Sequence, residues 1–267
     1  MNITVGPRAV RAAGCLVIAL ALAGCDLSIG PMTGRATEEW TRTYPLAPGG
    51  RIEITNINGR IDVEGSDVSQ VEVRAERIVK AATNDAAKEF LKRLEIREDV
   101  QPDRVKLETR HDRNGSIVVG ISYEVKYHVR APRGADIRVG TKNGGIMVAG
   151  ISGPVQARST NGAVVGKGLT GGVDAETTNG GVQIDLAEVG AEPVELRTTN
   201  GAIVLNLPET ARADISAACT NGGINVAGLQ LETRESGRRR LEARMNGGGT
   251  RIALKTTNGG IRIRGRA

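Results

Sequence analysis

Apolar and polar residues alternate along much of the chain. Residues 173–178 read Val-Asp-Ala-Glu-Thr-Thr, residues 182–186 read Val-Gln-Ile-Asp-Leu, and residues 194–198 and 203–207 repeat the same pattern. A period of two residues is typical of β-strands that turn one face toward a core. The sequence therefore predicts an all-β fold made of pairs of short strands joined by tight turns.

The predicted strand pairs are centred on a repeated Asn-Gly dipeptide. Each copy is close to Thr-Thr-Asn-Gly-Gly-Ile, and a weaker early copy contains Asn58. The central asparagines of the clear copies are Asn143, Asn161, Asn179, Asn200, Asn221 and Asn258, at spacings of 18, 18, 21, 21 and 37 residues. A fixed internal period of this kind indicates a repeat architecture.

Two architectures fit this repeat. Asn-Gly between alternating runs is typical of a type I′ hairpin, so a meander of hairpins is one of them. We favour a parallel β-solenoid of 18–21-residue coils, because the repeat has the length of one coil and every Asn-Gly then falls at the same corner. Stacked asparagines can bond amide to amide as a structural ladder. Asn179 has the parity of Val173, so we expect this ladder to point into the core.

The chain before residue 135 has a different texture. Thr83 is a candidate N-cap, and residues 84–94 read as one helix among short strands. We interpret residues 44–134 as a first coil with a small α+β elaboration near the N-terminal end, which would cap an open sheet edge. Residues 135–267 are predicted to form the regular β-solenoid, ending in a basic coil.

The first residues are typical of a secretory leader. Arg8 and Arg11 precede the apolar run 16–22, which is too short to span a membrane. The run ends in Leu-Ala-Gly-Cys at residues 22–25, which resembles the lipobox of bacterial lipoproteins. The resemblance implies that residues 1–24 are a signal peptide and that Cys25 carries the lipid.

The same resemblance implies a location. Residues 25–43 would form a lipidated tether that holds the chain to a membrane in the cell envelope, on the periplasmic side. Asp26 resembles a signal for retention at the inner membrane. Membrane contact through the N-terminal lipid is therefore the first partner that the sequence predicts.

The repeat itself resembles a known family. Thr-Thr-Asn-Gly-Gly-Ile at residues 256–261, its earlier copies and an Arg-rich penultimate stretch resemble the putative-adhesin β-helix family, bacterial domains of unknown function. The resemblance covers residues 52–263. It implies a repetitive parallel β-fold in a cell-envelope setting, and it supplies no catalytic residues.

Candidate chemistry is sparse. His111 and His128 have no second ligand at metal spacing, and Gly247-Gly248-Gly249 lacks the Lys-Ser/Thr partner of a phosphate loop, so we interpret it as a corner. Cys219 stands in the inward column of the repeat and is expected to be a buried, inert thiol. The outward acidic residues, which match no catalytic motif, are Asp174, Glu176, Asp185, Glu188 and Glu195. We therefore predict no enzyme activity, catalytic residue, metal or cofactor.

Charge is concentrated at the C-terminus. The net charge is +6, and residues 234–267 hold ten basic and two acidic residues. Arg238–Arg240 are expected at the tip of a protruding loop, and the candidate patch consists of Arg238, Arg239, Arg240, Arg262, Arg264 and Arg266. Such a patch suits an anionic envelope polymer or lipid headgroups, because Arg binds phosphate with two donors. The alternative interpretation is a charged edge that blocks end-to-end stacking.

Three functions follow as hypotheses. The first is a non-catalytic cell-envelope lipoprotein with an adhesin-like binding or scaffold surface. The second is an adhesin that recognises glycans or anionic polymers, and the third is a degenerate polysaccharide-active β-helix enzyme. Nucleic acid is not an expected partner, because the leader exports the chain and no aromatic platform accompanies the arginines. The sequence makes no prediction of an oligomeric state.

Overall fold

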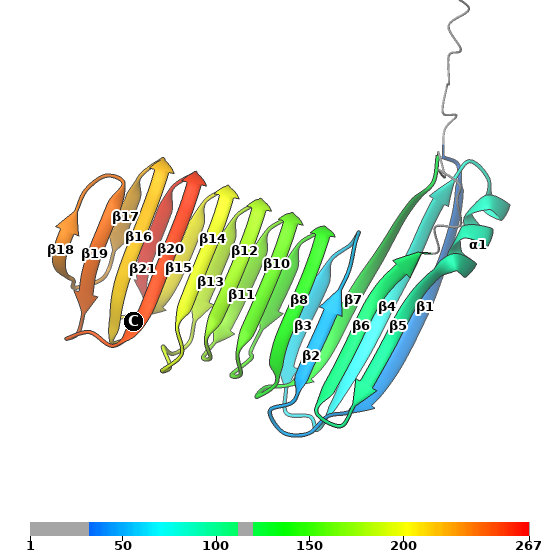
Figure 1. The fold of residues 1–267 in the computed structure, drawn as a ribbon, viewed down its shortest axis with the longest axis horizontal. Helices are drawn as coiled ribbons and strands as arrows, with labels where there is room; N and C mark the ends of the chain where they lie inside the picture. The colour runs from blue at the N-terminus through cyan, green and yellow to red at the C-terminus, as the bar shows by residue number, and fades with distance from the viewer. Residues whose placement is uncertain (1–31, 112–119, 267) are drawn as a thin grey trace, which may run out of the picture.

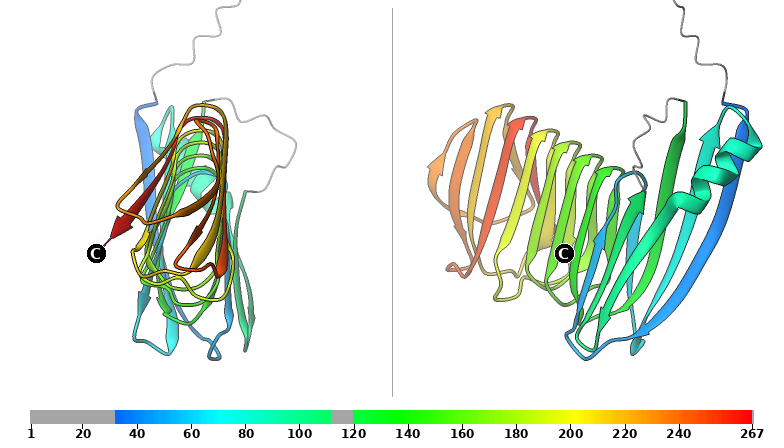
Figure 2. Two further views of the ribbon diagram at one scale, coloured as in Figure 1. Left: turned by 90° about the vertical axis from the view of Figure 1, so that its left-hand side faces the viewer. Right: turned by 45° about the vertical axis from the view of Figure 1, so that its right-hand side comes forward.

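The protein is an elongated stack of coils, and the strands of these coils form two β-sheets that face each other. The computed structural model describes residues 32–111 and 120–266. Successive strands that an Asn-Gly corner connects lie in opposite sheets (Figure 1). Seen along the long axis, the coils superpose into one flattened outline (Figure 2). The prediction of an all-β, solenoid-like fold with a small helical elaboration is confirmed, and the alternative meander of hairpins is wrong.

Each coil pairs in parallel with the next. Val155 lies opposite Val173, and Val173 lies opposite Val194, so like positions of the repeat stack in register. Seven coils can be followed through the described residues. Their strand pairs are β2 (Arg51–Thr55) and β3 (Ile61–Ser66), β8 (Asp136–Asn143) and β9 (Ile146–Ala149), β10 (Val155–Asn161) and β11 (Val164–Leu169), β12 (Val173–Asn179) and β13 (Val182–Leu186), β14 (Val194–Asn200) and β15 (Ile203–Pro208), β16 (Ala213–Asn221) and β17 (Ile224–Ala227), and β20 (Thr250–Asn258) and β21 (Ile261–Arg266).

The last coil of the sequence is not the last coil of the stack. Strand β20 lies between β14 and β16 in one sheet, and β21 lies between β15 and β17 in the other (Figure 1). Leu254 consequently has Leu196 on one side and Ala217 on the other. The C-terminal coil is thus inserted between coils that precede it in the sequence.

A β-hairpin makes this insertion possible and covers half of the end of the stack. It consists of β18 (Glu232–Ser236) and β19 (Arg240–Met245), and β19 pairs antiparallel with the free edge of β16. The chain then crosses the start of β16 through Gly247-Gly248-Gly249, where the Asn246 amide donates to the carbonyls of Glu209 and Ala211. The glycine run is therefore a tight crossover, as its interpretation as a corner predicted.

The other end of the stack is broader and mixed. Its additional elements are β1 (Gly34–Pro45), β4 (Gln70–Ala81), α1 (Asn84–Arg93), β5 (Leu94–Gln101), β6 (Arg104–His111) and β7 (Ser122–Pro132). The Thr83 hydroxyl accepts from the Ala86 amide at 3.2 Å, so the predicted N-cap is present. Phe90 and Leu91 are buried where α1 packs on β1 and β4. No helix within the described ranges is long and apolar enough to cross a membrane.

The predicted extent of the tether is wrong, because strand β1 belongs to the folded domain. Residues 25–43 were expected to link lipid and domain, but β1 begins at Gly34 and pairs along its whole length with β4. Only Gly34, Ala36 and Tyr44 of this strand are buried. An edge strand with so few apolar contacts shows little alternation, which is why its sequence resembled a linker.

Two tyrosines tie the sheets together near this end. The Tyr44 hydroxyl on β1 donates to the Glu98 carboxylate on β5 at 2.6 Å. Tyr127 on β7 is fully buried, and its hydroxyl lies 2.8 Å from that of Thr109 on β6. Burial raises the pKa of Tyr127 to about 12. The phenol therefore stays protonated far above neutral pH and keeps its bond across the core.

The corners are held from inside by hydroxyl groups. The Thr177 hydroxyl donates to the Gly162 carbonyl of the preceding coil at 2.8 Å, and Thr198 does the same toward Gly180. A Cβ on Gly180 would lie 2.3 Å from the Gly162 oxygen, so the glycine allows neighbouring corners to touch. Cys219 replaces threonine in this column and is buried, as its position in the repeat predicted.

The asparagines form an unbroken ladder outside the corner. Six side-chain bonds of 2.7–2.8 Å join the amides in the spatial order Asn58, Asn143, Asn161, Asn179, Asn200, Asn258 and Asn221. All but Asn58 are exposed, so the expectation that the ladder points into the core is wrong. Alternation ends at the turn, and the threonine two residues earlier takes the last inward place.

Replacing Gly180 by Ala should destabilise the protein by about 1–3 kcal/mol, because the new methyl group overlaps the Gly162 carbonyl of the preceding coil. Urea denaturation followed by circular dichroism measures this change. Gly134→Ala is the matched control, since a Cβ there meets nothing within 4 Å. Equal losses in the two variants would contradict a packing limit at the corner.

Leu254→Ala should cost about 2–5 kcal/mol and loosen β16, because β20 supports β16 from within the stack. The local readout is the rate at which a thiol reagent modifies Cys219, located by peptide mass spectrometry. Lys255→Ala, on the outward face of the same strand, should leave the rate unchanged. A Cys219 that reacts no faster in Leu254→Ala would argue against this support.

Candidate functional site

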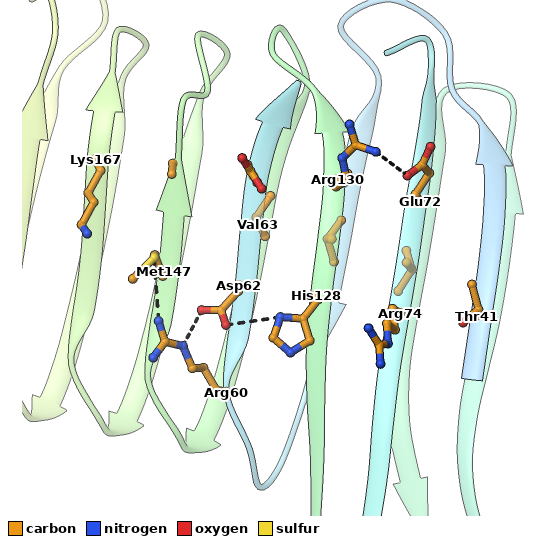
Figure 3. A pocket seen from close by; sticks show the side chains of 14 residues that line it. Thr41, Arg60, Asp62, Val63, Glu72, Arg74, His128, Arg130, Met147 and Lys167 are labelled. Atoms are coloured by element: carbon orange, nitrogen blue, oxygen red, sulfur yellow. Dashed lines mark hydrogen bonds and ion pairs between the residues drawn. The ribbon is translucent and has the colours of Figure 1, made fainter. Parts of the chain in front are cut away.

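A groove crosses the outer face of one sheet where its antiparallel and parallel parts meet. It encloses about 740 Å³, a volume in the range of small-molecule sites. Strands β1, β4, β7, β3, β9 and β11 pass beneath it in that order (Figure 3). Its lining residues are Thr41, Arg60, Asp62, Val63, Glu64, Glu72, Val73, Arg74, His128, Val129, Arg130, Met147, Ala149 and Lys167.

Strand register arranges the outward side chains of the groove in two rows. In one row, Arg74 on β4, His128 on β7, Asp62 on β3 and Met147 on β9 are successive partners. The other row has Glu72, Arg130, Glu64, Ala149 and Lys167 in the same strand order, continuing to β11. The two rows lie one pleat apart on the same face.

Most charged side chains of the groove form ion pairs with each other or with a residue at its rim. Asp62 bonds with the Arg60 guanidinium and lies 3.5 Å from Nδ1 of His128 (Figure 3). Arg130 donates to Glu72 at 3.0 Å and to the Ser66 hydroxyl at 3.2 Å.

Arg74 donates to Glu39 at the rim of the groove. These side chains are about half exposed or more, so the pairs add little stability. Their effect is to fix the direction of each polar group around a floor that includes Met147 and Ala149.

The polar side chains of the groove come from separate strands and form no metal site among the described residues. Among the residues that the structure describes, no three His, Cys, Asp or Glu side chains are placed to hold a metal ion. His128 and Asp62 come from separate strands that only the fold makes adjacent. The sequence showed no second ligand for His128, and nothing in the pattern showed that Asp62 would be its neighbour.

The predicted arginine patch is divided between two elements. Arg262 and Arg264 are exposed on β21, where their register partners are Val204 and Asn206 on β15 and Asn225 and Ala227 on β17. Neither arginine is paired with an acidic residue in the described structure. Arg266 differs, because its guanidinium lies 2.9 Å from the Asp185 carboxylate.

Arg238–Arg240 lie at the turn of the hairpin β18–β19. The carbonyls of Arg238 and Arg239 accept from the amides of Ile224 and Cys219, so the turn is docked on the end coil. The expectation of a protruding loop is therefore wrong. Strand β17 separates this turn from β21, which places Arg238 and Arg262 on either side of the strand at its start.

Ion pairing changes along the chain. Twelve of the fourteen described arginines from Arg42 to Arg197 form ion pairs, against two of the ten from Arg212 to Arg266. The unpaired members of the second group are Arg212, Arg234, Arg238, Arg239, Arg240, Arg251, Arg262 and Arg264. Uncompensated positive charge is therefore concentrated at the C-terminal end of the stack.

The outward carboxylates do not converge on a site. Asp174 and Glu176 both bind Arg158 at 2.6 Å, and Glu195 binds Arg197. Asp185 is on the opposite sheet, and Glu188 is exposed in the loop after it. His111 packs edge-on against the Tyr123 ring at 5.2 Å. Cys25, the predicted lipidation site, lies outside the described residues.

The chain is similar to a protein family and to solved structures of bacterial proteins. The family described as Toastrack DUF4097 matches residues 50–264. A putative cell adhesion protein from Clostridium sporogenes is 12% identical with a TM-score of 0.40, and the match covers 86% of this chain and 100% of that chain. A putative adhesin from Bacteroides fragilis is 9% identical with a TM-score of 0.31, covering 86% and 97%. No curated protein matches the chain.

Proposed function

The chain belongs to the Toastrack DUF4097 family, and we propose that it is a non-catalytic cell-envelope lipoprotein whose C-terminal end binds anionic groups of an envelope polymer. The observation that carries this proposal is the set of unpaired arginines at that end. Arg262 and Arg264 on β21 have neutral register partners on β15 and β17, and the turn with Arg238 and Arg239 lies beyond β17.

Chemistry favours phosphate or carboxylate as the bound group. A guanidinium presents two parallel donors, and it forms strong bidentate bonds with both anions. Arginines already bound to carboxylates, such as Arg158, would have to lose that partner first. The unpaired arginines have no such cost, so they bind an incoming anion more readily than any other basic cluster described.

The position of the patch favours a polymer over the headgroups of the anchoring membrane. Strands β1 and β21 are eight strand positions apart in one sheet, which corresponds to about 40 Å. A lipid on Cys25 would hold the β1 end near the membrane. The arginines on β21 would then be presented at the opposite end of the stack.

The alternatives have less support. An enzyme of the polysaccharide-active kind needs a pair of carboxylates facing a groove with different environments. Here the outward carboxylates Asp174, Glu176 and Glu195 are neutralised by Arg158 and Arg197. Recognition of glycans by stacking needs exposed aromatic rings. Phe90, Tyr44 and Tyr127 are buried, and the partly buried Trp40 and Tyr123 lie outside the regular coils.

Neutralising four arginines tests the patch. The quadruple variant Arg238→Gln, Arg239→Gln, Arg262→Gln and Arg264→Gln should bind polyphosphate at least about tenfold more weakly, or ~1.4 kcal/mol, with a shallower salt dependence. Isothermal titration at several salt concentrations measures both. Phosphatidylglycerol vesicles form the second arm, and stronger loss on vesicles than on polyphosphate would favour a lipid ligand.

The matched control removes paired arginines from the opposite sheet. Arg158→Gln with Arg197→Gln should change polyphosphate affinity by less than about twofold, since these guanidinium groups are occupied by carboxylates. Unchanged affinity in the quadruple variant would reject the patch as a binding surface. Equal losses per removed charge in the two sets would show that net charge alone governs binding.

Metabolic labelling tests the anchor. The thiol of Cys25 is the predicted acylation site. The full chain made in cells fed labelled palmitate should therefore carry the label, and the Cys25→Ala variant should carry none. Cys15→Ala keeps the leader intact and should label like the wild type. An unlabelled wild-type protein, in cells that label other lipoproteins, would exclude lipidation.

A further inference from the structure

Two charges in the groove lack the partner that their neighbours have. Glu64 on β3 and Lys167 on β11 are exposed, and within the described structure neither side chain makes an ion pair or a hydrogen bond. Arg130 is the register partner of Glu64, but its guanidinium is held by Glu72 and Ser66. The groove therefore presents one free carboxylate and one free ammonium group.

The free charges lie in the same row with an apolar residue between them. Glu64 is opposite Ala149 on β9, and Ala149 is opposite Lys167 on β11. The Cα atoms of Glu64 and Lys167 are thus two strand spacings apart, or about 10 Å. Met147, two residues before Ala149 on the same face of β9, lies in the neighbouring row, where its sulfur accepts from the Arg60 guanidinium at 3.7 Å (Figure 3).

We propose that this groove binds zwitterionic chain ends in which an ammonium group and a carboxylate are separated by a short apolar spacer. The ammonium group pairs with Glu64, the carboxylate pairs with Lys167, and the methylene groups between them cover Ala149. The diamino acid at the end of a peptide carries this combination of groups.

The surrounding ion pairs make the site selective. Arg60 is bound to Asp62 and Arg130 is bound to Glu72. Neither guanidinium therefore competes with the ammonium group of the ligand for the Glu64 carboxylate. A ligand with a single charge satisfies only one of the two free groups. The ammonium group and the carboxylate of the ligand must reach Glu64 and Lys167 at the same time, so the length of the spacer between them decides the affinity.

The site is separate from the C-terminal arginines. Strand β11 and strand β21 are three strand positions apart, about 15 Å, with β13 and β15 between them. Arg262→Gln with Arg264→Gln should therefore leave the groove unchanged. Failure at the groove and failure at the arginine patch are consequently distinguishable.

A ligand series with the full chain tests the spacing. In isothermal titration, ε-aminocaproate should bind at least about tenfold more tightly than γ-aminobutyrate, whose spacer is too short to reach both charges. Hexylamine and caproate, which each lack one charged group, should also bind at least about tenfold more weakly. Equal affinity across these four compounds, or no binding of any, would overturn the proposal.

Variants test the two residues. Glu64→Gln and Lys167→Gln should each weaken ε-aminocaproate binding at least about tenfold, while Lys142→Gln and Glu188→Gln, which lie outside the groove, should not. The double variant Glu64→Lys with Lys167→Glu restores one charge of each sign, so it should bind the same ligand in the reverse direction. A folded double variant that fails to bind would contradict pairing with these two side chains.

Discussion

The close approach of backbone at the Asn-Gly corners is the constraint on which the rest of the structure depends. Neighbouring corners stack so tightly that the carbonyl of Gly162 occupies the place where Gly180 would carry a side chain. Inside the corner, Thr177 satisfies that carbonyl, and outside it Asn179 bonds to Asn161. With the corners fixed, each strand starts at the same height as its neighbour, and the aliphatic residues form one continuous column. The register of the whole stack follows from this contact, since a slip of one residue would turn every core side chain outward.

Stacked coils leave open edges at both ends, and the chain closes the two ends differently. At the broad end, β1 and β5 are joined by the bond between Tyr44 and Glu98, and α1 lies over the adjoining strands. At the narrow end, the hairpin β18–β19 covers the edge of one sheet, and the short strand β17 is the edge strand of the other sheet. Short and covered edges reduce pairing with other chains. Insertion of the last coil behind this hairpin buries β20 on both sides, so the C-terminus stabilises the end of the stack from within.

Charge is distributed according to the same plan. Along the body, arginines and carboxylates from neighbouring coils meet at fixed strand spacing and neutralise each other, as Arg158 does with Asp174 and Glu176. At the C-terminal end, the register partners of Arg262 and Arg264 on the adjacent strands are neutral, so these charges remain available. In the groove, two of the charges in the rows are left free by the pairing of the others. Both proposed binding surfaces therefore arise where the regular pairing of the coils is interrupted.

The sequence by itself determined the strands, the corners and the chemistry available at them. Alternation predicted which side of β12 and β13 is buried, and the repeat predicted that Cys219 would be inside, because these features depend on local spacing. Tertiary structure alone decided the order of the coils, the exposure of the ladder, the role of β1 and the meeting of Asp62 with His128. Coils with the same motif are interchangeable as stacking partners, so their local sequence carries no information on which neighbour each one takes. The groove could not be predicted for the same reason. Its residues come from strands far apart in the chain, and the packing of the whole stack decides which of these strands pair.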